Sequence, residues 1–528
     1  MSNQQNPYNS YNQPPQMPPM GSMLPPKKRT WKERLMLNYG QGMQAATLKE
    51  ELTIPNWLIG RSVLFFFIAF AACTIVFGYA MPWKIAVVSC VGLPFFFYGA
   101  HSASRKWWRV RERGIVKKVF VTALVIRLVW VCISYFYLNT ALYGKLDGFG
   151  DDNWWYMYAG KEIADWLIGN SQLSFNKLRT EVICGAVDDT GFPFLLAIEY
   201  LLSIENSDVF VPLLFKALFD SYTCVGVYRI AHRHFDAGTA RMAALLMVYN
   251  PLSLFWISCI LKECEMVCIC MTSINLIDST LSAGKKISFR GLLPGLAVGA
   301  LLFFFRTALA LVVFIAVFAH IIFVSHKVMS NGKKVLAGVM VAIVMLVGLG
   351  DRISMQSQQL MDRVQSGDQH KSMEWRAERE GGNSFAKYAG AAVFAPLIFT
   401  IPFPTLNMAD EEQVMQMELA GGYYIKNILS FFVILLMLLL LISGEWRKHV
   451  FIEAYTVGYL VVLVMSEFAQ SGRFHMPIFP MLMIFAAYGI QIEKGNKRIK
   501  RVYTIVLVME VFVCLSWNWF KLKGRGMI

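Results

Sequence analysis

The chain has 528 residues, of which 56% are hydrophobic and only 16% are charged, and its mean hydropathy is +0.46. A soluble protein carries about 25% charged residues, so this composition excludes an ordinary soluble globular protein. The net charge of +15 does not indicate a nucleic-acid partner, because the lysines and arginines lie in short clusters between apolar runs, as they do in the cytoplasmic loops of membrane proteins.

The first 56 residues are expected to lie in the cytoplasm. Residues 1–26 are rich in Gln, Asn and Pro and lack apolar periodicity, which is typical of a disordered tail. Five basic residues follow at 27–34, and positive charge marks the cytoplasmic side of a membrane protein. We therefore assign residues 1–56 to a cytoplasmic tail and a juxtamembrane segment.

Two apolar runs, 57–80 and 83–100, come next. A helix needs roughly 20 apolar residues to cross a bilayer, so both runs predict membrane-spanning helices. The basic stretch 101–118 then predicts a cytoplasmic loop. Residues 57–118 thus form a unit of two N-terminal spans and a basic loop, ahead of a longer apolar region.

The region 119–492 alternates between apolar runs and polar loops, and a basic loop with one more run follows at 493–528. Alternating the direction of the runs leaves two large external loops, 139–208 and 350–422. Each contains an apolar stretch, 193–204 or 388–404, that suits an interfacial helix. The predicted fold is an all-α polytopic bundle of about thirteen spans. From residue 119 onward these spans are 119–138, 209–231, 239–257, 262–280, 291–305, 307–324, 335–349, 423–443, 450–468, 474–492 and 502–520.

The first external loop carries a pair of carboxylates, Asp151 and Asp152, followed by Tyr156 in an aromatic stretch that suits a helix at the membrane surface. A carboxylate at this place can act as a general base on an acceptor hydroxyl. The pair can also hold a divalent cation, Mg²⁺ or Mn²⁺, against a donor phosphate. The alternative is that both aspartates cap the helix that follows them.

Lys262 and Glu263 stand at the external start of a predicted span. Ionisable residues at such places are costly and usually face a cavity or a partner. These two residues are therefore candidates for substrate binding. A structural Lys–Glu pair is the alternative.

Basic residues also stand at external ends of spans: Arg306, and Arg473 with His475 near the last part of the core. A guanidinium group suits phosphate because it donates two hydrogen bonds in one plane. We take all three as candidates for binding a donor phosphate. The alternative is that their side chains only extend to the lipid headgroups.

Other charged residues are expected to have no chemical role. Asp188 and Asp189 are interpreted as solvated charges of the first external loop. Arg127, Lys216 and Asp220 lie within predicted spans and are expected to pair with one another.

The order of these features resembles the GT-C superfamily of membrane glycosyltransferases, which includes protein O-mannosyltransferases and bacterial aminoarabinose transferases. The resemblance covers residues 119–492 and depends on order more than on any single motif. A span leads to an external acidic pair, a tyrosine and an interfacial helix, and several further features follow. These are Gly191-Phe-Pro193, a basic span end from Tyr228 to Phe235, Asn250-Pro251, Glu263, and Arg473-Phe-His-Met-Pro-Ile-Phe-Pro480.

The resemblance implies a function. Members of this superfamily transfer a sugar from a polyprenyl-phosphate or dolichyl-phosphate carrier outside the cytoplasm, with inversion at the anomeric carbon. Their essential acid corresponds best to Asp152, with Asp151 beside it, and their late arginine to Arg473. The implied partners are a lipid-linked sugar donor, membrane lipids, and an acceptor glycan, lipid or protein. The expected location is a bacterial plasma membrane.

Two other functions fit a protein with these runs and loops. A polysaccharide polymerase also joins lipid-linked sugars outside the membrane and has long external loops such as 350–422. A transporter or lipid flippase is a less fitting alternative, because the charged residues gather near one face rather than in the middle of the spans.

Overall fold

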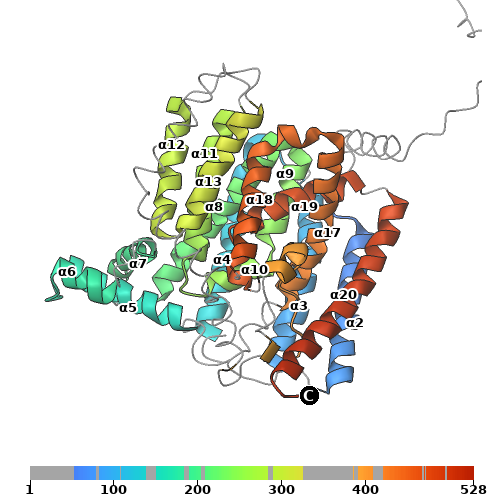
Figure 1. Cartoon of the computed structure of the whole chain (residues 1–528), viewed down its shortest axis with the longest axis horizontal. Coiled ribbons are helices and arrows are strands. Elements are labelled where there is room, and N and C mark those ends of the chain that lie inside the picture. The colour runs from blue at the N-terminus through green and yellow to red at the C-terminus, as the bar shows by residue number, and fades with distance from the viewer. Residues whose placement is uncertain are drawn as a thin grey trace, which may run out of the picture.

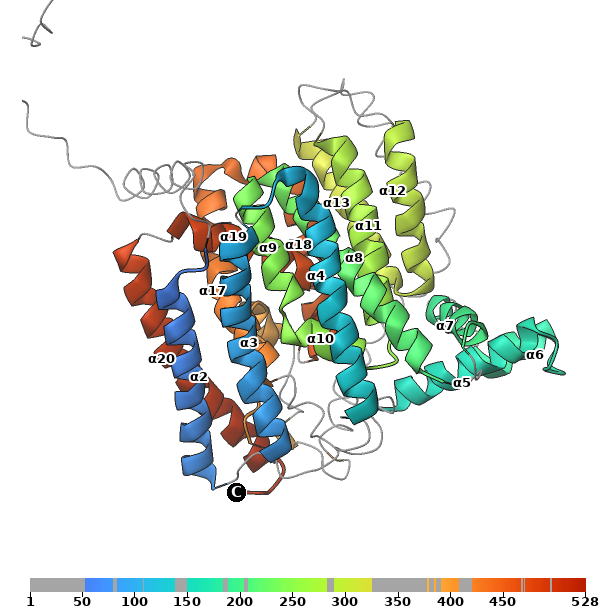
Figure 2. The ribbon, with the colours of Figure 1, turned by 180° about the vertical axis from the view of Figure 1, so that it is seen from behind.

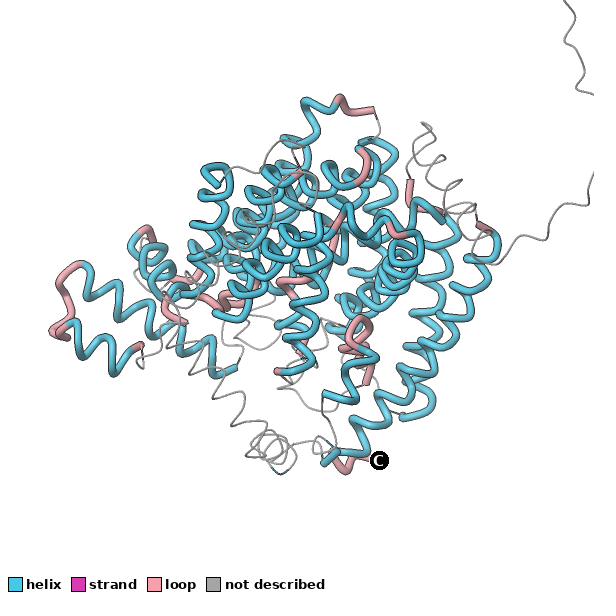
Figure 3. The backbone as a smooth tube through the Cα atoms, turned by 45° about the horizontal axis from the view of Figure 1, so that its top comes forward, coloured by secondary structure: helices cyan, strands magenta, loops and turns pink. Residues whose placement is uncertain are grey.

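The computed structural model describes residues 53–78, 83–107, 109–137, 150–183, 189–203, 208–282, 289–324, 378, 384–385, 391–407, 420–466, 469, 471–493 and 496–528. These residues confirm the all-α prediction, because they form helices and turns and contain no strand (Figure 3). The predicted tail 1–26, the run 335–349 and most of the loop 350–422 lie outside the described residues.

The described helices are α2 (Asn56–Phe77), α3 (Trp83–Trp107), α4 (Glu112–Ile133), α5 (Gly150–Leu167), α6 (Phe175–Lys177), η2 (Leu178–Val182), α7 (Gly191–Leu201), α8 (Phe210–His234), α9 (Ala237–Val248), α10 (Pro251–Ile257), α11 (Glu263–Leu281), α12 (Phe289–Leu301), η3 (Leu302–Phe304), α13 (Thr307–Val324), α16 (Ala391–Phe394), η6 (Ala395–Leu397), α17 (Ala420–Ser443), η8 (Glu445–Lys448), α18 (Val450–Met465), η10 (Gly472–His475), α19 (Phe479–Glu493) and α20 (Lys497–Gly524). Most of them overlap one of the predicted runs, but α3 and α4 also extend into the predicted basic loop 101–118, and α5, α6 and α7 lie within the predicted loop 139–208.

Among the described residues, five helices are long and apolar enough to cross a membrane, which fits an integral membrane protein. They are Asn56–Phe77, Glu112–Tyr137, Phe210–His234, Glu263–Leu281 and Gly421–Ser443. Other apolar runs form helices of 10–17 residues, such as Val450–Met465 and Phe479–Glu493. The total of about thirteen spans therefore stays a prediction.

The predicted span 239–257 is not one straight helix. It consists of α9 and α10, which are bent by 49° at the break between them. Pro251 begins α10 and has no backbone N–H to continue the hydrogen bonds of α9. The Asn250 side chain accepts a hydrogen bond from the Leu252 N–H at 2.9 Å, which caps the new helix.

The helices form a bundle from which α5, α6 and α7 extend sideways at one end (Figures 1 and 2). At its centre lies α19, in which every residue is buried and which packs against α9 and α17. At the opposite side from the α5–α7 arm, α2 and α20 lie side by side. Arg61 Nη1 donates to the Lys500 carbonyl and to Thr504 Oγ1, both at 2.7 Å, which links the two helices.

An irregular segment at 398–407 packs between α17 and α20. Backbone groups in an apolar region must be hydrogen-bonded by the protein itself, and side chains of the two helices serve this need. Ser430 Oγ of α17 donates to the Phe399 carbonyl at 2.5 Å, and Asn518 Oδ1 of α20 accepts from the Leu406 N–H at 2.8 Å. The two helices thereby fix the segment's position. Placement of the predicted stretch 388–404 at the interface stays a prediction.

Arg127 and Asp220 form the pair that the sequence predicts within the spans. Arg127 Nε donates to Asp220 Oδ2 at 2.5 Å, and both side chains are buried. Ser253 Oγ donates to the same oxygen at 2.6 Å. Lys216 does not take part, which corrects the expectation that the three residues pair with one another.

Replacing Asp220 with alanine is expected to destabilise the protein by about 3–5 kcal/mol, because the Arg127 charge would stay buried without its partner. Thermal unfolding of the purified protein in detergent would measure this as a lower Tm. The double variant Arg127→Met, Asp220→Leu removes both charges and should recover most of the loss. An unchanged Tm for Asp220→Ala alone would show that the pair does not support the fold.

Candidate functional site

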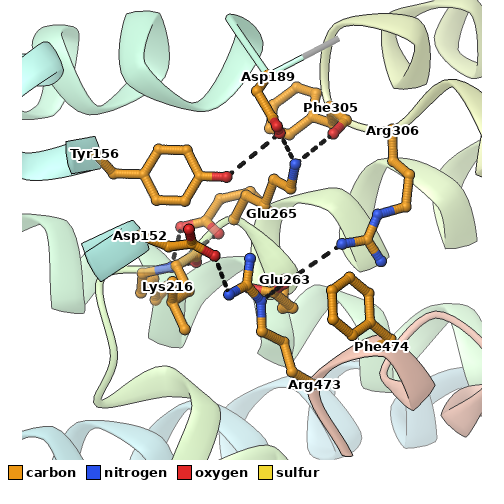
Figure 4. Close-up of polar contacts among 12 residues, drawn as sticks. Asp152, Tyr156, Asp189, Lys216, Glu263, Glu265, Phe305, Arg306, Arg473 and Phe474 are labelled. Carbon is orange, nitrogen blue, oxygen red and sulfur yellow. Dashed lines mark hydrogen bonds and ion pairs between the residues drawn. The ribbon is translucent and has the colours of Figure 1, made fainter. Parts of the chain in front are cut away.

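Charged side chains from five parts of the chain meet at one end of the bundle (Figure 4). They come from the start of α5, the residues before α7, the start of α11, the turn between η3 and α13, and η10. Unpaired charge is costly in the middle of an apolar helix, so these groups gather where the helices end. In a chain this apolar, a polar binding or catalytic site can form at the ends of the helices.

Arg473 is the centre of this group. Its Nε donates to Glu263 Oε1 at 2.6 Å and its Nη1 donates to Asp152 Oδ2 at 2.5 Å. Burial acts to lower the pKa of Arg473, but Glu263 and Asp152 raise it above its usual value, so the guanidinium stays charged. The residue before it is Gly472, where a methyl group would overlap the Tyr423 hydroxyl. The turn can therefore approach α17 closely only because residue 472 has no side chain.

Glu263 holds two guanidinium groups with one carboxylate. It is fully buried in the first turn of α11, where the helix dipole favours negative charge. Its Oε1 accepts from Arg473 and lies 3.9 Å from Arg306 Nη2. Its Oε2 has no hydrogen-bond partner among the described residues. Glu263 therefore acts as the fixed counter-ion of both arginines.

Phe474 lies beside both arginines. The Cζ atoms of Arg306 and Arg473 stand 4.4 Å and 5.3 Å from the centre of its ring, which is within the range of a cation–π interaction. Arg306 Nη1 also donates to the Tyr459 hydroxyl at 3.4 Å, and that hydroxyl donates to the Phe474 carbonyl at 2.9 Å. The sequence analysis did not single out Phe474 or Tyr459. The aromatic residue directly after Arg473 was the available signal for the first of them.

Lys262 belongs to a second part of the site. Its Nζ contacts the Asp189 carboxylate and donates to the Phe305 carbonyl at 2.8 Å. The Tyr156 hydroxyl donates to Asp189 Oδ1 at 3.3 Å, and burial raises the pKa of Tyr156, so it keeps its proton. Asp189 is thus a bonded member of the site, and the expectation that it is a solvated loop charge is wrong. Asp188 lies outside the described residues.

An ion pair between Lys216 and Glu265 stabilises the start of α11. Lys216 Nζ and the Glu265 carboxylate are 2.9 Å apart and both are buried. Lys216 also donates to the Leu261 carbonyl in the turn before α11. Lys216 and Glu265 thus form a buried ion pair that the sequence analysis did not predict. Of the two residues for which a structural pair was the alternative, Lys262 pairs with Asp189 and Glu263 with Arg473.

One of the predicted site residues, His475, is not part of this charge cluster, and the position of another side chain, that of Asp151, is not described. His475 is fully buried, and its Nε2 hydrogen-bonds the Ala469 carbonyl at 2.7 Å. Its imidazole therefore holds the turn rather than an anion. Asp151 lies in α5, but its side chain is outside the described residues.

The charges of the site fit an anion better than a divalent cation. The sequence offers the pair Asp151 and Asp152 for Mg²⁺ or Mn²⁺. Of these two, only the Asp152 side chain is described, and its Oδ2 accepts a hydrogen bond from the Arg473 guanidinium. No three His, Cys, Asp or Glu side chains in the described part of the chain are placed to share a metal ion. A cation at Asp152 would stand next to the positive charge of Arg473 and be repelled by it.

A second polar cluster lies at the other end of α8 and α11. Asp278 accepts from Arg233 Nε at 2.6 Å, from His234 Nε2 at 2.8 Å and from Ser282 Oγ at 3.0 Å. His234 Nδ1 lies 3.1 Å from His449 Nδ1. This carboxylate is bonded on both oxygens within the protein, which fits a structural link between helices. The Arg473 cluster, with a half-exposed carboxylate at its edge, is the better candidate for a substrate site.

Comparison with known proteins adds no assignment. No protein-family model matches the chain, and no curated protein matches it in sequence. The case for a function therefore depends on the geometry of the Arg473 cluster.

Proposed function

We propose that the protein is a membrane glycosyltransferase of the GT-C type. It moves a sugar from a polyprenyl-phosphate donor to a lipid, glycan or protein acceptor. One observation supports this most: Arg473 joins a half-exposed carboxylate, Asp152, to a buried one, Glu263, with a second arginine beside them. A candidate base, Asp152, and two arginines that can bind phosphate, Arg473 and Arg306, are thus within one cluster. Transfer from a phosphate carrier requires both kinds of group.

The proposed reaction is a single displacement at the anomeric carbon. The acceptor hydroxyl oxygen forms a bond to that carbon, and the bond from the carbon to the phosphate oxygen breaks, with its electron pair going to the phosphate. Asp152 takes the proton of the hydroxyl. The products are the glycosylated acceptor, polyprenyl phosphate and a protonated Asp152, with inverted configuration at the sugar.

Arg473 and Arg306 stabilise the leaving phosphate. A sugar linked through a phosphodiester carries one negative charge, and the released polyprenyl phosphate carries a second. Groups aimed at charge that develops during the reaction lower its barrier more than groups that bind the substrate alone. Glu263 fixes the guanidinium groups in place before the donor arrives, so little reorganisation is needed.

The proposal includes an orientation and a location. The end of the bundle with the Arg473 cluster faces away from the cytoplasm, and the basic loops at the other end lie in the cytoplasm of a bacterial cell. The α5–α7 arm rests on the outer leaflet. Trp154 and Tyr158 of α5 are about half exposed, and such aromatic side chains favour the membrane–water interface. The prenyl chain then lies in the bilayer below the arm.

Replacing Asp152 with asparagine tests the proposal. The amide keeps the shape of the side chain but cannot take the proton, so transfer should fall by about 10²- to 10⁴-fold. Mass spectrometry of lipids from cells that lack the wild-type chain should then show the sugar-phosphate donor accumulating. Asp165→Asn, the same change further along α5, is the matched control and should behave as wild type. Undiminished transfer by inserted Asp152→Asn protein would end the assignment of Asp152 as the base.

A further inference from the structure

Asp152 and Glu263 hold Arg473 in different ways. Glu263 is 1% exposed and bonds Nε, whereas Asp152 is 58% exposed and bonds Nη1. Each of the two bonds is short, at 2.5–2.6 Å. One partner of the guanidinium is therefore permanent, and the other stands at the edge of the cluster where a ligand can replace it.

The carboxylate of Asp152 cannot serve two purposes at once. While it neutralises Arg473 it occupies the guanidinium edge that a donor phosphate needs. Its Oδ2 accepts a hydrogen bond from Arg473 Nη1 at 2.5 Å, so this oxygen faces the guanidinium rather than an acceptor hydroxyl. Catalysis of the proposed kind therefore requires that Asp152 leave Arg473 before the proton moves.

We propose that Asp152 is the resident anion of the donor-phosphate site. The phosphate of the donor displaces the Asp152 carboxylate from Arg473, and this exchange frees the carboxylate to act on the acceptor hydroxyl. The inference rests on the proposed function and extends it to the order of events. The donor binds first, and only then is a free base present.

The charges of the described site residues are consistent with this exchange. Two arginines and Lys262 carry three positive charges, and Asp152, Asp189 and Glu263 carry three negative ones. When Asp152 turns away, one positive charge is left over, which is the charge that a phosphodiester neutralises. During transfer one negative charge passes from Asp152 to the phosphate, so the total charge of the site stays constant.

The energies also favour displacement. An ion pair with an exposed partner contributes little to stability, and Asp152 is 58% exposed, so little is lost when Asp152 leaves. A phosphate can accept two parallel hydrogen bonds from a guanidinium, which makes such pairs among the stronger ones in proteins. Asp152 lies in the first turn of α5, so a change of its rotamer suffices and the helix need not unwind.

Binding of polyprenyl phosphate without a sugar measures the exchange directly, with the purified full-length protein in lipid nanodiscs. Asp152→Asn should bind this probe about fivefold more tightly than wild type, because the competing anion is gone. Asp152→Glu keeps the charge and should bind like wild type, as should the control Asp165→Asn. Polyprenyl alcohol lacks the phosphate, and its binding should not respond to Asp152→Asn.

Unchanged or weaker binding of polyprenyl phosphate by folded Asp152→Asn protein overturns the displacement, and so does an equal gain for the alcohol. Failure of the proposed function would look different. If wild type transfers no sugar while Asp152→Asn still binds the phosphate more tightly, the displacement stands and sugar transfer is rejected. If transfer requires Asp152 but phosphate binding does not respond to it, the reverse holds.

Discussion

Replacing Arg473 with glutamine is expected to reduce sugar transfer by about 10³-fold or more, since removing even one neutral hydrogen-bond donor from a developing charge costs about 10²- to 10³-fold. Arg473 contributes a full charge, and it bonds both the proposed base and the buried carboxylate. The variant therefore loses phosphate binding and the stabilisation of the leaving group together. Accumulation of the donor lipid in cells, measured by mass spectrometry, reports the loss.

Two further variants separate charge from geometry. Arg473→Lys keeps a positive charge but loses the planar fork that reaches both carboxylates, so its transfer should fall between wild type and Arg473→Gln. Arg498→Gln changes an exposed arginine at the start of α20 and should transfer at the wild-type rate. Wild-type transfer by folded Arg473→Gln protein would contradict the placement of the donor phosphate.

Replacing Glu263 with glutamine is expected to impair both stability and transfer. The change removes the only buried carboxylate that the described residues place on Arg473, and it leaves two guanidinium groups beside one ring. Losing one partner of a buried pair costs about 3–5 kcal/mol, so the Tm in detergent should drop clearly. Transfer should also fall, because the two arginines are no longer held in place.

The same variant offers a test that a purely structural role would not pass. Added polyprenyl phosphate supplies the missing negative charge, so it should raise the Tm of Glu263→Gln more than the Tm of wild type. Asp220→Asn is the matched control, because it also removes a buried carboxylate from an arginine but lies outside the site. If the lipid raises the Tm of both variants equally, Glu263 is not part of a phosphate site.

The sequence could predict the site because charge is rare in this chain and costly within a membrane. Asp152 and Arg473 are 321 positions apart, yet the alternation of apolar runs assigns both to the same face, and the structure joins them. Glu263 and Arg306 follow the same logic. The side of the membrane predicted for each residue thus indicated which residues could meet, but not which of them would form ion pairs.

Other features of the site and the fold cannot be predicted from the pattern of apolar runs, because that pattern says nothing of how loops and turns fold. The sequence predicts Asp189 as a solvated charge, because nothing in the residues of the loop 139–208 indicates that Asp189 contacts Lys262. His475 shares a motif with Arg473, but the 3₁₀ turn of η10 places its imidazole in the interior packing. The sequence carries a signal for the break before Pro251, because Asn250-Pro251 is a helix cap followed by a residue without an N–H. The apolar run continues through this dipeptide, so hydropathy alone predicts one span.

The most direct test of the central claim is the fate of the donor lipid. Purified protein would be added to solubilised membranes from cells that lack it, and the lipids would be followed by mass spectrometry. The account predicts that a polyprenyl-phosphate sugar disappears while an equal amount of polyprenyl phosphate forms, and that Arg473→Gln protein causes neither change. Release of polyprenyl diphosphate from a lengthening glycan would instead indicate a polymerase. Donor that stays intact, and only changes leaflet in proteoliposomes, would indicate a flippase and contradict sugar transfer.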